Sequence, residues 1–292
     1  MFKSGFVSII GRPNVGKSTL MNALLGEKIS IVSNKPQTTR NKVTGILTLP
    51  EAQVVFLDTP GIHRPKGLLN EYMVKAAKNA CEEVDLVLLM VEAGRRPAPG
   101  EEEILDFVKG LGTKVFLVIN KIDLVEKAAL LPLIERYSSM NIFAEVIPVS
   151  SLKDVNLGDL QTTIIGYLPE GPKYFPDEDL SDQPERFIVA EIVREKIFRY
   201  TGEEVPYSTA VLVEEMKDKG DIVYARADIY VEKESQKAII IGAGGRMLKK
   251  IGQAAREDAE KLLGSKIFLE LWVKVKKDWR DKPGALREMG YK

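Results

Sequence analysis

Short apolar runs alternate with segments of helical periodicity through the first part of the chain. The apolar runs predict strands at Phe6–Ile10, Val43–Leu49, Val54–Leu57, Leu86–Val91, Val115–Ile119 and Val146–Val149. The segments between them predict helices at Lys17–Leu25, Leu69–Cys81, Glu101–Lys109, Ala128–Ser139 and Leu157–Tyr167. Because several strands are continuously apolar, we expect them to be covered on both faces. This α/β order predicts a mostly parallel sheet with helices on both faces, over residues 1–170.

The pattern changes at residues 171–184, where prolines and acidic residues predict a linker. The elements predicted beyond it are a helix at Glu185–Tyr200, strands at Ser208–Glu215 and Ile222–Glu232, a helix at Met247–Leu263 and a strand at Ile267–Val275. A short apolar segment, Ala238–Ile241, precedes the long helix. We therefore expect a second, α+β domain over residues 185–292.

A glycine-rich loop follows the first predicted strand and opens the first predicted helix. Its sequence, GRPNVGKS at residues 11–18, matches the phosphate-loop pattern G-x-x-x-x-G-K-[ST] in the structural context that supports it. Backbone N–H groups of such a loop hold phosphates, Lys17 reaches the β- and γ-phosphates, and Ser18 ligates Mg²⁺. The predicted nucleotide contacts here are Gly11, Arg12, Pro13, Asn14, Val15, Gly16, Lys17, Ser18 and Thr19.

Two further segments predict that the base is guanine. Asn120-Lys121-Ile122-Asp123 follows an apolar strand and resembles the N-K-x-D motif of GTPases. A carboxylate can accept hydrogen bonds from guanine N1 and from its exocyclic amine, and adenine lacks this donor pair, so the site discriminates strongly. Ser150-Ser151 follows the next strand and resembles the segment that closes over guanine, with Ser151 at the usual Ala position.

A switch is predicted from two polar segments. Asp58-Thr59-Pro60-Gly61 ends a strand and resembles the D-x-x-G element, in which the carboxylate holds Mg²⁺ through water and the Gly61 N–H contacts the γ-phosphate. Upstream, QTTRN at residues 37–41 resembles a segment whose threonine ligates Mg²⁺ in the triphosphate state. We expect Thr39 to be that ligand, with Thr38 as the alternative. Such segments order around the γ-phosphate and relax after hydrolysis.

The usual water-orienting side chain is missing after the D-x-x-G glycine. Ras-like enzymes place a Gln after the D-x-x-G glycine, whereas this chain has Ile62, followed by His63. An apolar side chain cannot orient water, and a lone His beside a polar loop is more often a solvated surface residue. Asn14 resembles the Asn that binds K⁺ in some GTPases. We expect slow intrinsic turnover that depends on Lys17, Thr39, Gly61 and Asn14.

The second domain contains a different glycine cluster, Gly242-Ala243-Gly244-Gly245-Arg246. It lacks a G-K-[ST] ending, so a second nucleotide loop is the weaker interpretation, and an ordinary turn between helices is the plainest one. The order helix, strand, strand, helix, GxxG, helix, strand resembles a type II KH domain, whose loop approaches the backbone of about four single-stranded nucleotides. The predicted RNA contacts are Ile241, Gly242, Ala243, Gly244, Gly245, Arg246, Lys249 and Lys250.

Composition changes this picture in two ways. Lys and Arg number 42, as do Asp and Glu, but residues 172–234 hold 9 basic and 16 acidic side chains while residues 235–292 hold 14 and 7. The basic portion carries the GxxG loop, as expected of a nucleic-acid surface. One His and one Cys exclude a Cys/His zinc cluster and an internal disulfide. We also expect neither a signal peptide nor a membrane-spanning segment.

Together these motifs resemble the Era family of bacterial GTPases with a C-terminal KH domain. The resemblance rests on GRPNVGKS, QTTRN, DTPGI, NKID and IGAGGR, and on the ending ALREMGY at residues 285–291. It implies a P-loop GTPase domain followed by a type II KH domain, with GTP or GDP and Mg²⁺ bound. It also implies binding to the 3′ end of small-subunit ribosomal RNA, a role in assembly of the small subunit, and a cytoplasmic location with peripheral membrane association. We expect a monomer.

Two other functions stay open at this point. A metabolic P-loop kinase or ATPase would prefer ATP, which Asn120–Asp123 argues against. A GTPase whose C-terminal domain binds protein instead of RNA is the closer alternative.

Overall fold

The computed structural model describes residues 1–94 and 100–291. It divides into two compact units. The first comprises Met1–Ser30, Thr39–Pro65 and Met73–Asp182, and the second comprises Ile31–Thr38, Lys66–Tyr72 and Gln183–Lys292. The boundary after Asp182 falls inside the linker predicted at residues 171–184.

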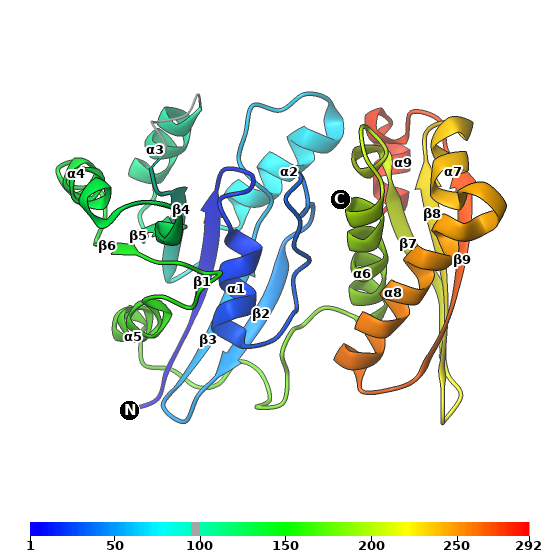
Figure 1. The fold of residues 1–292 in the computed structure, drawn as a ribbon. Coiled ribbons are helices and arrows are strands. Elements are labelled where there is room, and N and C mark those ends of the chain that lie inside the picture. Colours follow the sequence, from blue (N-terminus) through cyan, green and yellow to red (C-terminus); the bar gives the residue numbers. More distant parts are fainter. Residues whose placement is uncertain (95–99, 292) are drawn as a thin grey trace. The chain divides into compact units, whose positions relative to one another are not determined.

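Within the described residues of the first unit, strands form one sheet in the order β2-β3-β1-β4-β5-β6 (Figure 1). Their bounds are β1 Lys3–Gly11, β2 Val43–Thr48, β3 Ala52–Asp58, β4 Leu86–Glu92, β5 Lys114–Asn120 and β6 Glu145–Pro148. All neighbours are parallel except β2 and β3, which are antiparallel. The carboxyl ends of β1, β3, β4 and β5 therefore meet at one edge, where ligands bind in open α/β sheets.

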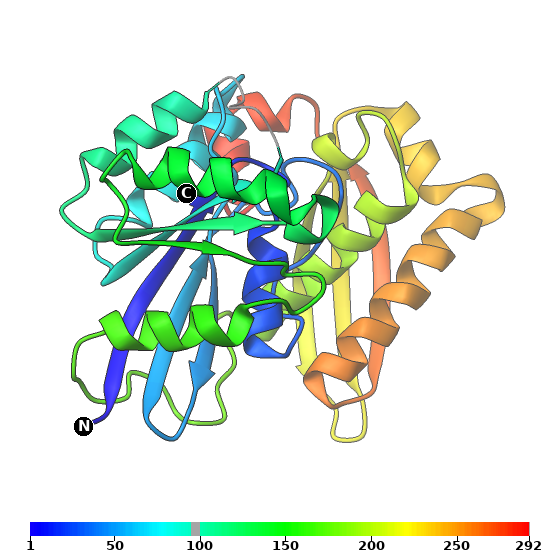
Figure 2. The same cartoon turned by 60° about the vertical axis from the view of Figure 1, so that its left-hand side comes forward.

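Helices cover both faces of this sheet, as predicted (Figures 1 and 2). The helices are α1 Lys17–Leu25, α2 Leu68–Asn79, α3 Glu101–Lys109, α4 Lys127–Ser138 and α5 Leu157–Tyr167. One face is packed by α2, α3 and α4, since Ala77, Ile104 and Tyr137 share a core with Val87 and Leu89. Helices α1 and α5 contact each other on the opposite face.

The second unit has a smaller sheet, β7-β8-β9, with helices on one face. Its elements are α6 Glu185–Tyr200, β7 Ala210–Asp218, β8 Val223–Val231, α7 Glu234–Ile241, α8 Arg246–Leu263 and β9 Ile267–Val275. Alternate β8 residues, Ala225, Ala227 and Ile229, are fully buried against residues such as Val193 and Ile251 from the helices. The order of elements is the predicted KH arrangement, with α7 and α8 joined by the glycine cluster.

A short C-terminal helix, α9 (Pro283–Glu288), was not predicted from the sequence. Trp279, just before it, is fully buried, and its indole N–H donates to the Ser208 carbonyl at 2.9 Å. Its ring stacks on Tyr291 with 5.8 Å between centroids. These contacts anchor a segment whose own periodicity is too short to predict a helix. In the described part of the chain, no helix combines the length and apolar character needed to cross a membrane.

Candidate nucleotide site and nucleic-acid groove

The phosphate loop joins β1 to α1 and contains positive φ angles, which glycine adopts far more readily than other residues. Gly11 and Gly16 have φ of +147° and +104°, and Asn14 has φ of +65°. A Cβ on Gly11 would lie 2.5 Å from the Met90 carbonyl oxygen, and one on Gly16 would lie 2.3 Å from Asn120 Nδ2. The loop therefore needs glycine at both positions, and it ends at the N-terminus of α1, which favours an anion.

Three oxygen-bearing side chains from separate segments converge beside this loop. Ser18 Oγ lies 2.6 Å from Asp58 Oδ2 and 2.9 Å from Thr39 Oγ1, and Thr39 Oγ1 lies 3.3 Å from the same carboxylate oxygen. Asp58 is fully buried, and its other oxygen, Oδ1, has no hydrogen-bond partner among the described residues. Hydroxyl and carboxylate oxygens with a free acceptor position suit Mg²⁺ and its bound waters. The donor set thus fits the predicted metal.

Burial raises the pKa of Asp58, while Lys17 and the hydroxyls of Ser18, Ser30 and Thr39 oppose that rise. Ser30 donates to Asp58 Oδ2 at 2.6 Å and was not predicted as a site residue. It is held by Asn22, whose Oδ1 accepts from the Ser30 N–H at 2.9 Å. A polar Asn within the otherwise apolar second half of α1 was the signal that could have identified this support.

The geometry favours Thr39 over Thr38 as the metal ligand. Thr38 Oγ1 donates to the Lys35 carbonyl at 2.7 Å, so it serves the backbone of its own loop.

We expect Thr39→Ala to lower Mg²⁺-dependent affinity for a GTP analogue at least about tenfold, because a ligand to the metal is lost. GDP affinity should be unchanged. The matched variant Thr38→Ala should behave as wild type in the same titrations; equal losses in both variants would contradict the assignment.

Lys17 is buried and its ammonium donates to the carbonyls of Arg12 and Gly11 at 3.0 and 3.3 Å. Burial lowers the pKa of Lys17 to about 8, although Asp58 partly opposes this. A lysine that titrates near pH 8 binds phosphate only after it takes up a proton. Nucleotide binding and protonation are therefore linked.

This linkage predicts a pH dependence of GTP affinity. Below pH 8 Lys17 is already charged in the free protein, so affinity should be flat. Above pH 8 binding must take up a proton, so affinity should fall toward a limit of about tenfold per pH unit. Titrating a fluorescent GTP analogue from pH 7 to pH 10 measures this. Lys17→Arg should have a lower affinity that does not fall further above pH 8, because a guanidinium stays protonated. A wild-type affinity that stays constant up to pH 10 would exclude the linkage.

The base-recognition segments are joined to the phosphate loop by Asn120. Its Nδ2 donates to the Val15 carbonyl at 2.8 Å, and its Oδ1 accepts from the Ser151 N–H at 3.0 Å and the Ser151 hydroxyl at 2.9 Å. Asn120 is buried. The structure therefore shows this residue cross-linking three loops, and its predicted contact to the nucleotide stays a prediction.

Asp123 is exposed and oriented by its neighbours. Its Oδ1 accepts from the Ser150 hydroxyl at 2.5 Å. Lys121, in a left-handed backbone conformation with φ of +64°, pairs with Glu92 at 3.1 Å. The first contact orients the Asp123 carboxylate, and the second orients the neighbouring Lys121 and adds Glu92 to the predicted set.

The segment after Asp58 carries backbone groups toward the phosphate loop and turns its side chains away. Gly61 lies so close that a Cβ would stand 2.6 Å from the Pro13 nitrogen, and the Ile62 N–H donates to the Gly11 carbonyl at 3.0 Å. Thr59 Oγ1 donates to the Ile9 carbonyl at 2.7 Å. Ile62 is buried in the core beside α2 and α3. His63 Nδ1 lies 2.8 Å from the Gly61 carbonyl oxygen.

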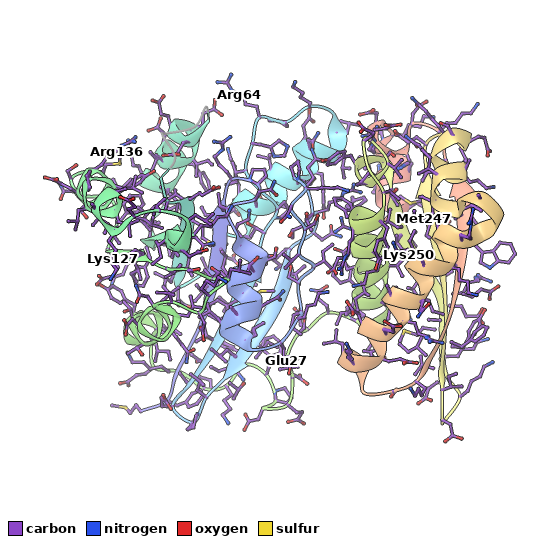
Figure 3. The ribbon with its side chains drawn as sticks, viewed as in Figure 1. Glu27, Arg64, Lys127, Arg136, Met247 and Lys250 are labelled. Carbon is purple, nitrogen blue, oxygen red and sulfur yellow. The ribbon has the colours of Figure 1, made fainter. Side chains whose placement is uncertain are left out.

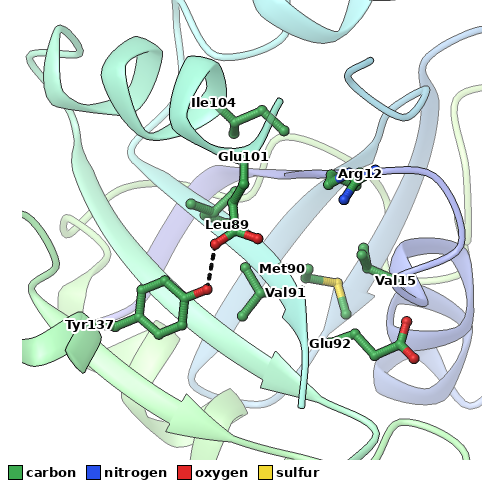
Figure 4. A pocket seen from close by; sticks show the side chains of 9 residues that line it. All are labelled: Arg12, Val15, Leu89, Met90, Val91, Glu92, Glu101, Ile104 and Tyr137. Carbon is green, nitrogen blue, oxygen red and sulfur yellow. Dashed lines mark hydrogen bonds between the residues drawn. The ribbon is translucent and has the colours of Figure 1, made fainter. Parts of the chain in front are cut away.

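A small cavity lies behind the phosphate loop, lined in part by Arg12, Val15 and Glu92 (Figure 4). Its volume is about 30 Å³, enough for a water molecule and too small for a nucleotide. Tyr137 Oη donates to the buried Glu101 carboxylate at 2.6 Å along one wall. Burial and this carboxylate raise the pKa of Tyr137. We assign the cavity a packing role.

The second unit contains a larger groove, of about 540 Å³, between α8 and β9. Its lining residues are Gly245, Leu248, Lys249, Gly252, Gln253, Arg256, Ile267, Phe268, Leu269 and Leu271. The α8 members recur at helical spacing on one face. A Cβ on Gly252 would lie 3.3 Å from Leu271 Cδ1, so this glycine lets the helix approach the strand. The whole β9 wall was absent from the predicted RNA contacts.

The glycine turn opens this groove. Gly242 has φ of +70°, and a Cβ there would lie 2.7 Å from Met247 Cβ. Gly244 and Gly245 have φ of +59° and +77° with no other atom within 4 Å of a Cβ, so they face open space. Lys249 lines the groove, whereas Lys250 projects from the other side of α8, with its ammonium 4.3 Å from the Tyr200 ring centroid (Figure 3).

Comparisons with known proteins find relatives of both units. A family model described as 50S ribosome-binding GTPase matches residues 6–121, and one described as KH domain matches residues 204–280. The chain is 53% identical to the GTPase Era of Staphylococcus haemolyticus (strain JCSC1435) over 290 residues, which is 99% of this chain and 97% of that protein.

Solved structures match over the full length as well. The crystal structure of Era in complex with MgGDPNP and nucleotides 1506–1542 of 16S ribosomal RNA has a TM-score of 0.96 and 46% identity, covering 100% of this chain and 99% of that one. A variant of Aquifex aeolicus Era bound to GDP.AlF4⁻ has a TM-score of 0.95 and 46% identity, covering 99% of each chain. The first family model names the large ribosomal subunit but matches fewer than half of the residues, so the full-length relatives identify the family.

Proposed function

The chain belongs to the Era family of GTPases, and from this premise we propose that it is a GTP-hydrolysing switch that binds the 3′ end of 16S ribosomal RNA and assists assembly of the small ribosomal subunit. The observation that carries the switch is the convergence of Ser18, Thr39 and Asp58 at 2.6 to 3.3 Å beside the phosphate loop. The α8–β9 groove next to the glycine turn supports RNA binding.

We assign each nucleotide-site residue a physical role. Lys17 and the backbone of residues 11–19 hold the phosphates, and Asp123 reads the base while Ser150 orients it. Bound Mg²⁺ would neutralise charge that develops on the phosphates. Ser18 and Thr39 would ligate it directly, and Asp58 would hold one of its waters. The Gly61 N–H would meet the γ-phosphate.

Orientation of the attacking water must come from groups other than Ile62, because that side chain is buried in the core. We propose that Asn14, exposed on the phosphate loop in a left-handed conformation, helps to hold a monovalent cation that supplies part of this function. Turnover without a partner is then slow and depends on the cation.

The cation proposal predicts a selective loss in Asn14→Ala. Wild-type GTP turnover should be about tenfold faster in K⁺ than in Na⁺, since a correctly sized cation acts as a preorganised charge. Asn14→Ala should turn over at the slower rate in both salts. Release of phosphate under single-turnover conditions measures this, and Asn141→Ala, at another exposed asparagine with positive φ, is the control. Equal K⁺ and Na⁺ rates in the wild type would exclude the cation role.

The nucleotide state should gate RNA binding. GTP orders the segments around Thr39 and Gly61, and a switch and an RNA-binding module share one chain. Affinity for nucleotides 1506–1542 of 16S ribosomal RNA, measured with GDP, a GTP analogue and no nucleotide, tests this coupling. Three equal affinities would exclude it, and the absence of any RNA binding would favour a protein partner for the second unit.

We propose a cytoplasmic protein that associates peripherally with the inner face of the cell membrane. Cys81 is buried, which raises its pKa to about 11, and an unreactive lone thiol suits a reducing compartment. Co-sedimentation with anionic and neutral vesicles tests the membrane contact.

A further inference from the structure

The open face of the β7-β8-β9 sheet carries a cluster of aromatic side chains that no part of the proposed function uses. Leu269 and Leu271 of β9 point toward the helices and join the core, so the alternate residues Phe268 and Trp272 stand on the opposite face. Phe268 is 57% exposed and Trp272 is 53% exposed. Exposed apolar side chains that gather on one surface, unlike single ones, are typical of binding sites.

Neighbouring side chains hold these rings in place. The Phe268 ring stacks against Tyr224 of β8, with 6.0 Å between centroids and 14° between planes, where the two residues pair in register. Glu270 lies between Phe268 and Trp272 on the strand and accepts from Tyr224 Oη at 2.7 Å and from Trp272 Nε1 at 2.8 Å. One carboxylate thus fixes two ring edges, which lowers the cost of ordering them around a ligand.

Phe268 also connects this face to the RNA groove. It lines the groove wall, whose α8 side begins at Gly245 in the glycine turn and whose β9 side includes Ile267 and Leu271. A KH groove holds about four nucleotides, so a longer single strand must continue beyond it. Cations accompany the rings on this side, since the Lys219 ammonium lies 5.1 Å from the Tyr224 centroid. Aromatic faces next to cations are the usual means of binding unpaired bases.

We propose that Phe268, backed by Tyr224, is a base-stacking site for a nucleotide of single-stranded RNA that leaves the α8–β9 groove. The site rests on the proposed RNA-binding function and extends it beyond the glycine turn. It adds affinity through a π-face that any base can cover, so it does not read sequence by hydrogen bonds.

The test uses the full chain with a GTP analogue and Mg²⁺, and RNA of nucleotides 1506–1542 of 16S ribosomal RNA. Phe268→Ala should weaken binding about tenfold, within the range of one stacked base. Phe268→Tyr, which keeps the ring, should bind within about twofold of wild type, and Phe268→Leu, which keeps apolar bulk without a ring, should resemble alanine. GTP turnover and thermal stability report that each variant is folded.

Salt titration and abasic RNAs separate stacking from charge. Phe268→Ala should shift the plot of log affinity against log salt without changing its slope, whereas Lys249→Ala should reduce the slope by about one. Removal of the one base that stacks on Phe268 should weaken binding by the wild type. Phe268→Ala should bind this abasic RNA and the intact RNA equally well, because the two changes remove the same contact.

Three results would overturn the proposal: normal binding by Phe268→Ala, weak binding by Phe268→Tyr, or additive losses at every abasic position. In each case Gly244→Asp is the check and must still abolish binding. That result would show that the groove binds RNA and that only the stacking site is excluded. Failure of the wild type to bind this RNA would instead overturn the proposed function.

Discussion

Replacing Asp123 with asparagine is expected to move the nucleotide preference from guanine to xanthine by about 1,000-fold or more. The carboxylate presents acceptors to the N1–H and the exocyclic amine of guanine. Asparagine presents one acceptor and one donor, so a guanine amine meets a like donor, while xanthine offers a carbonyl oxygen at that position. A mismatched buried polar pair is the costliest form of discrimination available to a binding site.

The comparison of kcat/KM for GTP and XTP measures this shift. Ser150 should still orient the new side chain, since its hydroxyl lies 2.5 Å from Asp123 Oδ1 and can donate to an amide oxygen as well. Asp159→Asn, an equal change at an exposed position on α5, is the matched control and should leave both substrates unaffected. If Asp123→Asn still prefers GTP, guanine is recognised elsewhere. An ATP preference in the wild type would revive the kinase or ATPase alternative.

The double substitution Gly244→Asp and Gly245→Asp is expected to lower RNA affinity at least about 100-fold. The phosphate backbone must approach the glycine turn closely, and two carboxylates there both obstruct and repel it. Neither position has an atom within 4 Å of a Cβ, so the cost to the free protein is confined to the positive φ of each residue. GTP turnover without RNA should therefore be retained.

Gly26→Asp provides the control for charge and backbone strain. Gly26 follows α1 in the first unit, has φ of +71° and also has no atom within 4 Å of a Cβ. It should bind RNA within about threefold of wild type, because it belongs to neither the glycine turn, the groove nor the aromatic cluster of the second unit. Filter binding or fluorescence anisotropy with the 16S fragment measures all three proteins. Retained binding by the double variant would exclude the glycine turn as the RNA contact.

The sequence predicted the elements well where periodicity was strong. Every strand and helix predicted from alternation or from a continuous apolar run is present, and α1, α3 and α5 have the predicted bounds. Helix α9, which spans Pro283–Glu288, is present but was not predicted, and it depends on burial of Trp279 and Tyr291. A helix this short is stabilised by tertiary contacts, so its own six residues carry too little pattern to predict it.

The phosphate loop, the base-recognition segment and the glycine turn could be identified from sequence because each is a continuous stretch whose backbone conformation depends on its own residues. Positions with positive φ favour glycine, so Gly16 and Gly244 indicate these backbone conformations in the sequence itself. The order of predicted strands and helices around these stretches completed the assignment to a GTPase unit and a KH unit.

Tertiary structure decided which residues distant in sequence meet. It brings Thr39 to Ser18 and Asp58, and it places Asn120 between three loops. It put Lys249 in the groove and Lys250 outside it, and it supplied Phe268 from another element. The physical reason is that the local pattern determines on which face of its own helix or strand a side chain lies. Helix packing and strand register then determine which residues that face contacts.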